Sequence, residues 1–252
     1  MGKKPIIILT LLFTLIFIGF YLFSKKNRIE EKITTTTQKI DQIIENIAPQ
    51  PTKILESGLP DKHLTKTAFI EQAPEKNWAE PWQDACEEAA LLTVDYFYKN
   101  QTPPVEEQRD AILKMLDFEK NAGFTNDVNI SQMAAISAEY LGYKPKIVDN
   151  PTVEDIKKSI SQNIPVIIPV AGKILFKENK HFKSGGPYYH NLTILGYDDT
   201  KQKFIVHDVG TQFGAYFQYS YDLLMESIHD FPLSGKKEDI LIGAKKILIL
   251  TP

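Results

Sequence analysis

Cys86, His190 and Asp208 are the residues of this chain whose side chains could together carry out nucleophilic catalysis. Cys86 is the only cysteine among the 252 residues. A thiol attacks a carbonyl carbon as a thiolate, and it needs a base, often histidine, whose orientation is fixed by a carboxylate. A single cysteine is more commonly a small buried hydrophobic residue. The catalytic interpretation therefore depends on elements that bring the three side chains together.

The segment WQDACEEAALLTVDYFY, residues 82–98, predicts a helix that begins next to Cys86. Apolar residues recur at helical spacing after Cys86, and Asp84 stands where an N-cap residue is expected. Cys86 then lies in the first helical turn, where free backbone amides and the helix dipole favour an anion. This position predicts a lowered pKa for the thiol.

Two predicted strands place His190 beside Asp208. The segment HNLTILGYDD begins at His190, and the segment KFIVHDVG carries Asp208 near its end. A turn at 198–202 would join the strands as an antiparallel hairpin, in which the start of the first strand lies beside the end of the second. Taken singly, a histidine that caps an element and an aspartate in a turn are the alternatives.

The remaining elements follow an α+β order, with helices first and strands later. Further helices are expected over residues 105–120, 131–141, 152–162 and 220–228, with Thr152 as an N-cap. Strands are expected over 144–148, 164–170, 191–197, 204–206 and 240–250. The helix of Cys86 would then belong to a helical subdomain that faces an antiparallel sheet.

Composition excludes several classes of function. Hydrophobic residues make up 43% of the chain, enough for a sizeable core. The net charge of -3 gives no indication of a nucleic-acid partner. The single cysteine excludes an internal disulfide and a zinc site of several cysteines, and His181 and His190 lack a matching ligand cluster. Neither a metal nor another cofactor is expected.

The N-terminal residues predict a membrane anchor. Residues 5–23, PIIILTLLFTLIFIGFYLF, carry no charge and are long enough to cross a hydrocarbon core. No small-x-small cleavage pattern comes after this run, so residues 1–27 are expected to form an uncleaved transmembrane signal anchor. Residues 28–63 are expected to form a partly helical stalk, with a dimerising helix as the alternative. Because such anchors commonly export the C-terminal remainder of a chain, the domain at 64–252 is expected outside the cytoplasm.

Five segments of the chain, in order, carry a family resemblance: FIEQAP, NW, CEEAALL, HNLTILGYDD and VHDVGTQFG. They resemble the papain-like cysteine peptidases of the bacteriocin-leader-processing type, family thirty-nine, and especially its stand-alone branch. The resemblance covers about residues 64–252 and implies a papain-like fold that acts on a peptide or protein. It assigns the nucleophile to Cys86, the base to His190 and the orienting carboxylate to Asp208.

The resemblance also implies a glutamine that helps the backbone amide of the cysteine to bind the oxyanion. Gln72 matches the pattern of a strand followed by glutamine, but the loop between it and Cys86 must then bulge outward. Gln83 is nearer to Cys86 and competes for the role, although its position also suits a helix cap. Gln72 is the preferred candidate.

Glu87 and Glu88 come directly after Cys86, where the commoner form of the family has glycine and proline. Carboxylates in a first helical turn stabilise the helix, but they raise a thiol pKa if they approach it. A solvated or capping role is their default interpretation. Three hypotheses result: a membrane-anchored thiol peptidase, a peptide-binding module of the same fold that has lost catalysis, and an amidase or acyl transferase acting on cell-wall peptide.

Overall fold

The structure is a computed structural model that describes Lys25 and residues 58–252. Apart from Lys25, the predicted anchor at 1–27 lies outside the described residues, as does most of the predicted stalk at 28–63. The described residues from Gly58 to Pro252 form one compact unit. Within the described part of the chain, no helix has the length and apolar character needed to cross a membrane.

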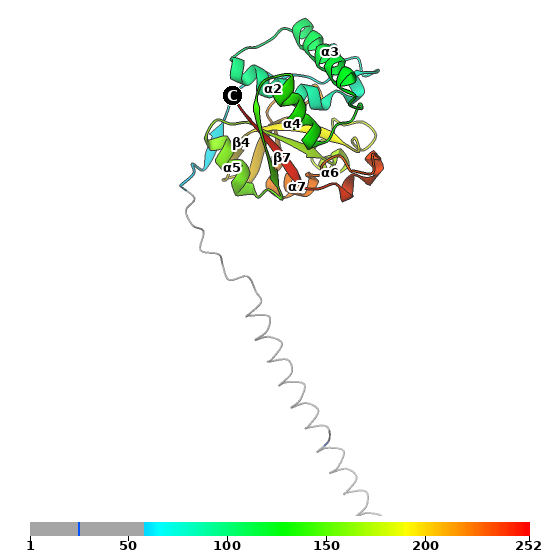
Figure 1. Ribbon diagram of the computed structural model, residues 1–252. Coiled ribbons are helices and arrows are strands. Elements are labelled where there is room, and N and C mark those ends of the chain that lie inside the picture. The colour runs from blue at the N-terminus through cyan, green and yellow to red at the C-terminus, as the bar shows by residue number, and fades with distance from the viewer. Residues whose placement is uncertain (1–24, 26–57) are drawn as a thin grey trace, which may run out of the picture. The chain divides into compact units, whose positions relative to one another are not determined.

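An antiparallel sheet of seven strands runs through the centre of the unit (Figure 1). Its strand order is β2-β7-β3-β4-β5-β6, and β1 pairs with β4. The strands are β1 (Lys62–Leu64), β2 (Lys144–Asp149), β3 (Val166–Val170), β4 (His190–Asp198), β5 (Lys203–His207), β6 (Phe217–Ser220) and β7 (Lys246–Thr251).

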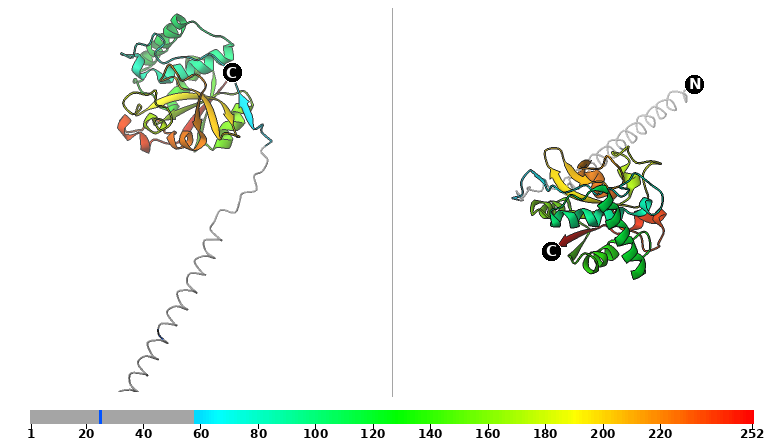
Figure 2. Two further views of the ribbon diagram at one scale, coloured as in Figure 1. Left: turned by 180° about the vertical axis from the view of Figure 1, so that it is seen from behind. Right: turned by 90° about the horizontal axis from the view of Figure 1, so that it is seen from above.

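Helices cover both faces of this sheet (Figures 1 and 2). One face carries α2 (Cys86–Lys99), α3 (Val105–Ala122) and α4 (Ile130–Glu139), and the other carries α5 (Val153–Ser161) and α7 (Tyr221–Ser227). Strand β3 shows why both faces are buried. Ile167 packs with the core of α2 to α4, whereas Val166 and Ile168 pack with the core of α5 and α7, because successive side chains of a strand point to opposite faces.

The mixed helical and antiparallel architecture agrees with the α+β prediction, but the placement of the helices differs from it. The sequence predicted one helical subdomain against the sheet, whereas α5 and α7 pack on the face opposite to α2. Thr152 is the N-cap of α5 as predicted, and it forms a capping box with Asp155. The pattern of one apolar face identifies α5 as a surface helix, but it does not say which face of the sheet the helix covers.

The predicted strand at 240–250 is wrong in its first half. Residues Lys237–Ile242 form the 3-10 helix η2, and β7 begins only at Lys246. Gly243 packs so closely against Asp230 that a Cβ atom would stand 1.9 Å from the Asp230 carbonyl oxygen. This contact fixes the chain between η2 and β7. Four further elements were not predicted: β1, β6, the 3-10 helix η1 (Trp82–Asp84) and the short helix α6 (Gly172–Leu175).

Candidate active site

Helix α2 places Cys86 at its first position and packs against β4 through a hydrogen bond from Thr193 Oγ1 to the Ala90 carbonyl, 3.4 Å long. The predicted N-cap is wrong. Asp84 belongs to the 3-10 turn η1 (Trp82–Asp84), and Ala85 precedes the helix without a side-chain cap. Because Trp82 is buried and anchors that turn, Asp84 is held one residue too early to cap α2.

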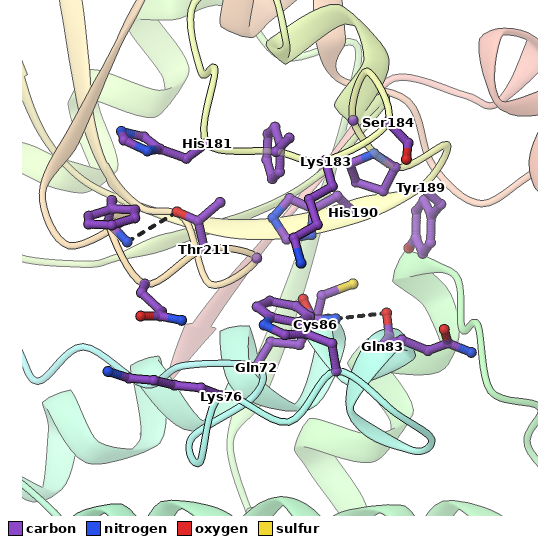
Figure 3. A pocket seen from close by; sticks show the side chains of 17 residues that line it. Gln72, Lys76, Gln83, Cys86, His181, Lys183, Ser184, Tyr189, His190 and Thr211 are labelled. Carbon is purple, nitrogen blue, oxygen red and sulfur yellow. Dashed lines mark hydrogen bonds between the residues drawn. The ribbon is translucent and has the colours of Figure 1, made fainter.

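A cleft of about 570 Å³ opens beside Cys86. Figure 3 shows Gln72, Lys76 and Cys86 on one wall of this cleft, and His181, Lys183 and His190 on the opposite wall. The first wall comes from α2 and the loops before it, and the second comes from β4 and the loop that precedes it. The cleft therefore lies where the helix of the cysteine meets the strand of the histidine.

The predicted hairpin of β4 and β5 is confirmed, and it brings His190 next to Asp208. The two strands pair antiparallel with Thr193 opposite His207, so the start of β4 lies beside the end of β5. His190 Nε2 is 2.9 Å from Asp208 Oδ1, and both side chains are buried. Because Asp208 engages Nε2, Nδ1 is the ring nitrogen left to exchange a proton with a reactant.

Asp208 is held by partners that the sequence did not reveal. The Tyr219 hydroxyl donates to Asp208 Oδ2 over 2.5 Å, Asn179 Nδ2 donates to the same oxygen over 3.0 Å, and the Gly210 amide donates to Oδ1 over 3.2 Å. Burial alone would raise the pKa of Asp208, but hydrogen bonds and charge from His190, with the bonds from Tyr219 and Asn179, hold that pKa below its ordinary value. Asp208 is therefore a carboxylate near neutral pH.

His190 is the one histidine, of five in the described residues, that has a carboxylate partner. The other rings contact different groups: His63 bonds the Asn163 side chain, His207 and His229 bond backbone carbonyls, and His181 stacks on Phe213 at the cleft. The His190 ring also packs against Phe182 in a T-shaped arrangement, with ring centroids 5.6 Å apart. The imidazole is thus fixed by a hydrogen bond and by packing.

The thiol of Cys86 has Glu87 and Asn191 as its hydrogen-bond partners, and not His190. Its Sγ donates to Glu87 Oε2 over 2.9 Å and accepts a long contact of 3.8 Å from Asn191 Nδ2. Cys86 is only 4% exposed. The expected lowering of its pKa is therefore not found: burial raises the pKa of the thiol well above its ordinary value, and the neighbouring Glu87 and Glu88 raise it further. These effects on the thiol pKa outweigh the lowering expected from the helix N-terminus.

The two candidate glutamines have different surroundings. Gln72 is buried at the cleft, and its amide nitrogen donates to the carbonyls of Trp82 and Gln83 over 2.9 and 2.8 Å. Figure 3 shows the Gln83 side chain directed away from Cys86, where it is exposed and bonds Glu80. Gln72 is thus the glutamine held beneath Cys86, with both amide hydrogens engaged by backbone carbonyls.

Comparison with known proteins gives the family. A family model described as Peptidase_C39 like family matches residues 66–233, well over half of the chain. The chain belongs to this C39-like peptidase family. The match spans all four predicted site residues, from Gln72 to Asp208. The mixed helical and antiparallel fold is accordingly a papain-like, C39-like fold.

Two bacterial proteins of solved structure are among those similar to the chain. A structure from Bacillus anthracis assigned as a C39-like peptidase has 14% sequence identity and a TM-score of 0.47, and the match covers 77% of this chain and 98% of that one. Xylellain, a cysteine protease from Xylella fastidiosa, has 13% identity and a TM-score of 0.41, with coverage of 80% and 90%. No curated protein matches the chain.

In this C39-like chain, Glu87 and Glu88 do not have the solvated or capping role expected from the sequence, because both side chains are fully buried. Among the described residues, no group of three or more histidine, cysteine, aspartate or glutamate side chains is arranged to hold a metal ion. The buried acids therefore act on each other and on Cys86.

Proposed function

We propose that this protein hydrolyses peptide bonds with Cys86 as nucleophile, His190 as general base and acid, and Asp208 as the group that orients the imidazole. The observation that carries the proposal is the His190–Asp208 hydrogen bond of 2.9 Å in a cleft that Cys86 also lines. A histidine held by a buried carboxylate beside a cysteine at a helix start is the arrangement that thiol-dependent acyl transfer needs.

The reaction begins when the S–H bond of Cys86 rotates from Glu87 towards the cleft and the proton passes to Nδ1 of His190, while the sulfur keeps its contact with Glu87. The sulfur then attacks the substrate carbonyl, and the C–S bond forms as the carbonyl oxygen becomes an oxyanion. His190 returns the proton to the leaving amine as the C–N bond breaks. Water, deprotonated by His190, hydrolyses the thioester and restores the thiol.

The oxyanion is stabilised by the backbone amide of Cys86, which is free of an intrahelical acceptor at the start of α2. Gln72 supplies the second donor when one of its bonds to the Trp82 and Gln83 carbonyls is released. Gln72→Ala should reduce turnover by about 10²-fold or more, whereas Gln83→Ala, whose side chain is exposed, should leave turnover unchanged. The reverse ranking would assign the role to Gln83.

The substrate is a peptide or protein segment, and the charge of the cleft favours an acidic one. The lining includes Lys76 and Lys183 and contains no aspartate or glutamate. Paired peptides that differ by one glutamate-to-lysine exchange test this preference. The acidic peptide should be cleaved faster than the basic one. Lys183→Glu should reduce the ratio of the two cleavage rates, whereas Lys158→Glu on α5 should leave that ratio unchanged. Equal rates for the two peptides would exclude cleft charge as a determinant.

Replacement of the nucleophile tests the reaction itself. Cys86→Ala should abolish hydrolysis of a peptide library, and mass spectrometry of the wild-type products separates hydrolysis from transfer to another amine. Residual hydrolysis by Cys86→Ala would refute the assignment. The second candidate function, a peptide-binding module without catalysis, is favoured by one observation: the resting thiol bonds Glu87 and not His190. Peptide binding without turnover by the wild type would support that candidate.

We also propose that residues 1–27 anchor the protein in a membrane and that the C39-like domain lies outside the cytoplasm. The support is the uncharged run at 5–23 in the sequence. Protease added to spheroplasts should degrade the domain while the membrane stays sealed. A domain that stays protected until the membrane is lysed would contradict export, and a chain recovered in the fraction free of membranes would contradict anchoring.

A further inference from the structure

Glu87 is a buried acid in direct contact with the nucleophile, and the proposed reaction leaves it without a role. Its side chain is fully buried. Oε2 accepts the hydrogen bond of the Cys86 thiol over 2.9 Å, and Oε1 accepts from the Val128 amide over 3.2 Å. Both carboxyl oxygens are therefore fixed, and one of them lies at the reacting sulfur.

The titratable groups that face Glu87 are acids and one phenol. Cys86 and Glu88 lie on the same helix, Asp127 lies in the loop before α4, and Tyr189 lies directly before β4. Tyr189 is held there by a hydrogen bond from its hydroxyl to the Val128 carbonyl, 2.8 Å long. Burial first, and then the charge of Asp127, raise the pKa of Glu87 to about 8.

We propose that Glu87 positions the nucleophile by donating a hydrogen bond from its carboxylic acid form to the Cys86 thiolate once His190 has taken the thiol proton. This inference rests on the proposed peptidase function. The thiol proton passes to Nδ1 of His190, and the Glu87 proton stays on Glu87. A buried thiolate that accepts such a bond is stabilised, since its charge is otherwise unsolvated.

The carboxylate form of Glu87 has the opposite effect. It accepts the thiol hydrogen bond, as the 2.9 Å contact allows, and its negative charge opposes formation of a second anion on sulfur. Because Glu87 is protonated below a pH of about 8 and ionised above it, the thiolate–imidazolium pair is supported at the lower pH. The reactivity of Cys86 should therefore decline as the pH rises through this range.

The rate of alkylation of the full-length protein by iodoacetamide, followed by intact mass, tests the proposal, and the single cysteine makes each adduct a report on Cys86. Glu87→Gln keeps the volume and an N–H donor but cannot ionise. The ratio of its rate to the wild-type rate should rise by about tenfold or more between about pH 6 and about pH 9. Glu88→Gln is the matched control, equally buried but without a contact to Sγ, and because Glu88 acts on the thiol through its charge alone, the ratio of its rate to the wild-type rate should rise less.

A Glu87→Gln ratio that is constant with pH would overturn the inference, as would a Glu88→Gln ratio that rises equally. If Glu87→Gln lacks the thermal unfolding transition of the wild type, the variant is not folded and the pH profile of the wild-type alkylation rate is the test. A wild-type rate that climbs steadily from about pH 6 to about pH 9 would contradict the proposal. Failure of the proposed peptidase function looks different: the wild-type rate would then equal that of His190→Ala at every pH.

Discussion

At the scale of residues, Asp208 determines the orientation of the His190 imidazole in the cleft. Its Oδ1 is hydrogen-bonded to Nε2 of His190, while Tyr219 and Asn179 donate hydrogen bonds to Oδ2. Gly210 packs so closely against the ring that a Cβ atom there would stand 2.7 Å from Cε1 of His190. The orientation of the base thus depends on a hydrogen-bonded carboxylate and on a position that admits only glycine without a shift of the ring.

The variant Asp208→Asn tests this orientation. The amide is nearly isosteric, but it cannot stabilise an imidazolium, and its nitrogen can favour the wrong tautomer of His190. Peptide hydrolysis should fall by between about 10²-fold and 10⁴-fold, while the circular dichroism spectrum stays native. Asn179→Ala, which removes one of two donors to Oδ2, should give a smaller loss. Unchanged hydrolysis by Asp208→Asn would show that the carboxylate does not serve the base.

Residue types and hairpin pairing were enough to predict that His190 and Asp208 are neighbours. The hydrogen-bond donors to Asp208 were not predictable, because Asn179 lies in a loop and Tyr219 lies on β6, a short strand without a clear alternating pattern. The thiol pKa was predicted in the wrong direction. Helix position was visible in the sequence, whereas the burial of Cys86 beside Glu87 arises from tertiary packing.

At the scale of elements, the start of α4 supports the acid that contacts the nucleophile. Asn129 caps α4 through a capping box with Gln132, and the preceding Val128 donates its amide to Glu87 and accepts from Tyr189. A cap fixes the entry of the chain into a helix. The Asn129 cap therefore holds Val128 as well as α4.

Asn129→Ala should lower the free energy of unfolding by about 1 kcal/mol, which for a chain of this size is a fall of about 2 to 4 °C in the melting temperature. Thr152→Ala, which removes the equivalent capping box of α5, should cost a similar amount. Only the Asn129 variant should also change the rate of Cys86 alkylation, since α5 lies on the other face of the sheet. Equal alkylation rates in both variants would exclude a role of the α4 cap at the site.

Elements with complete local signals were predicted well, and elements defined by tertiary contacts were not. The helix predicted over 105–120 is α3 (Val105–Ala122), which ends at Gly123 in the left-handed conformation. In contrast, Asp84 has the residue type of a cap but lies inside η1. The competing turn is set by burial of Trp82, which local spacing does not reveal.

At the scale of the whole molecule, buried acids make stability depend on pH. Glu88 on α2 and Glu119 on α3 interact with each other, and both are buried. No other side chain in the described part of the chain donates to either carboxyl group, so the pair is satisfied when one carboxyl is protonated and donates to the other. Burial raises the pKa of both residues above the ordinary value, and the charge of Glu119 raises that of Glu88 further.

Glu88 and Glu119 therefore hold more protons in the folded protein than in the unfolded chain above the ordinary glutamate pKa of 4.5. Their contribution to the free energy of unfolding should fall as the pH rises from there, by up to about 1.4 kcal/mol per pH unit for each of the two groups. Denaturant unfolding at a series of pH values measures this slope. Glu88→Gln, which needs no proton to stay neutral, should flatten it. A slope that the variant leaves unchanged would contradict protonation of the pair.

The layered arrangement as a whole was only partly predictable. The α+β class follows from the order of periodic segments, and the family of the chain agrees with it. The assignment of helices to the two faces depends on long-range packing of β3 and its neighbours, so it could not be predicted from local periodicity. The membrane anchor stays a prediction that belongs to residues outside the described part of the chain.

Activation of Cys86 by His190 is tested most directly by the second-order rate of Cys86 alkylation with iodoacetamide near neutral pH. We expect His190→Ala to lower this rate by about tenfold or more, because the thiolate of a buried cysteine loses its imidazolium partner. Phe182→Leu, which changes the packing of the ring without removing the base, should have a smaller effect. Equal rates in the wild type and in His190→Ala would show that His190 does not activate the thiol.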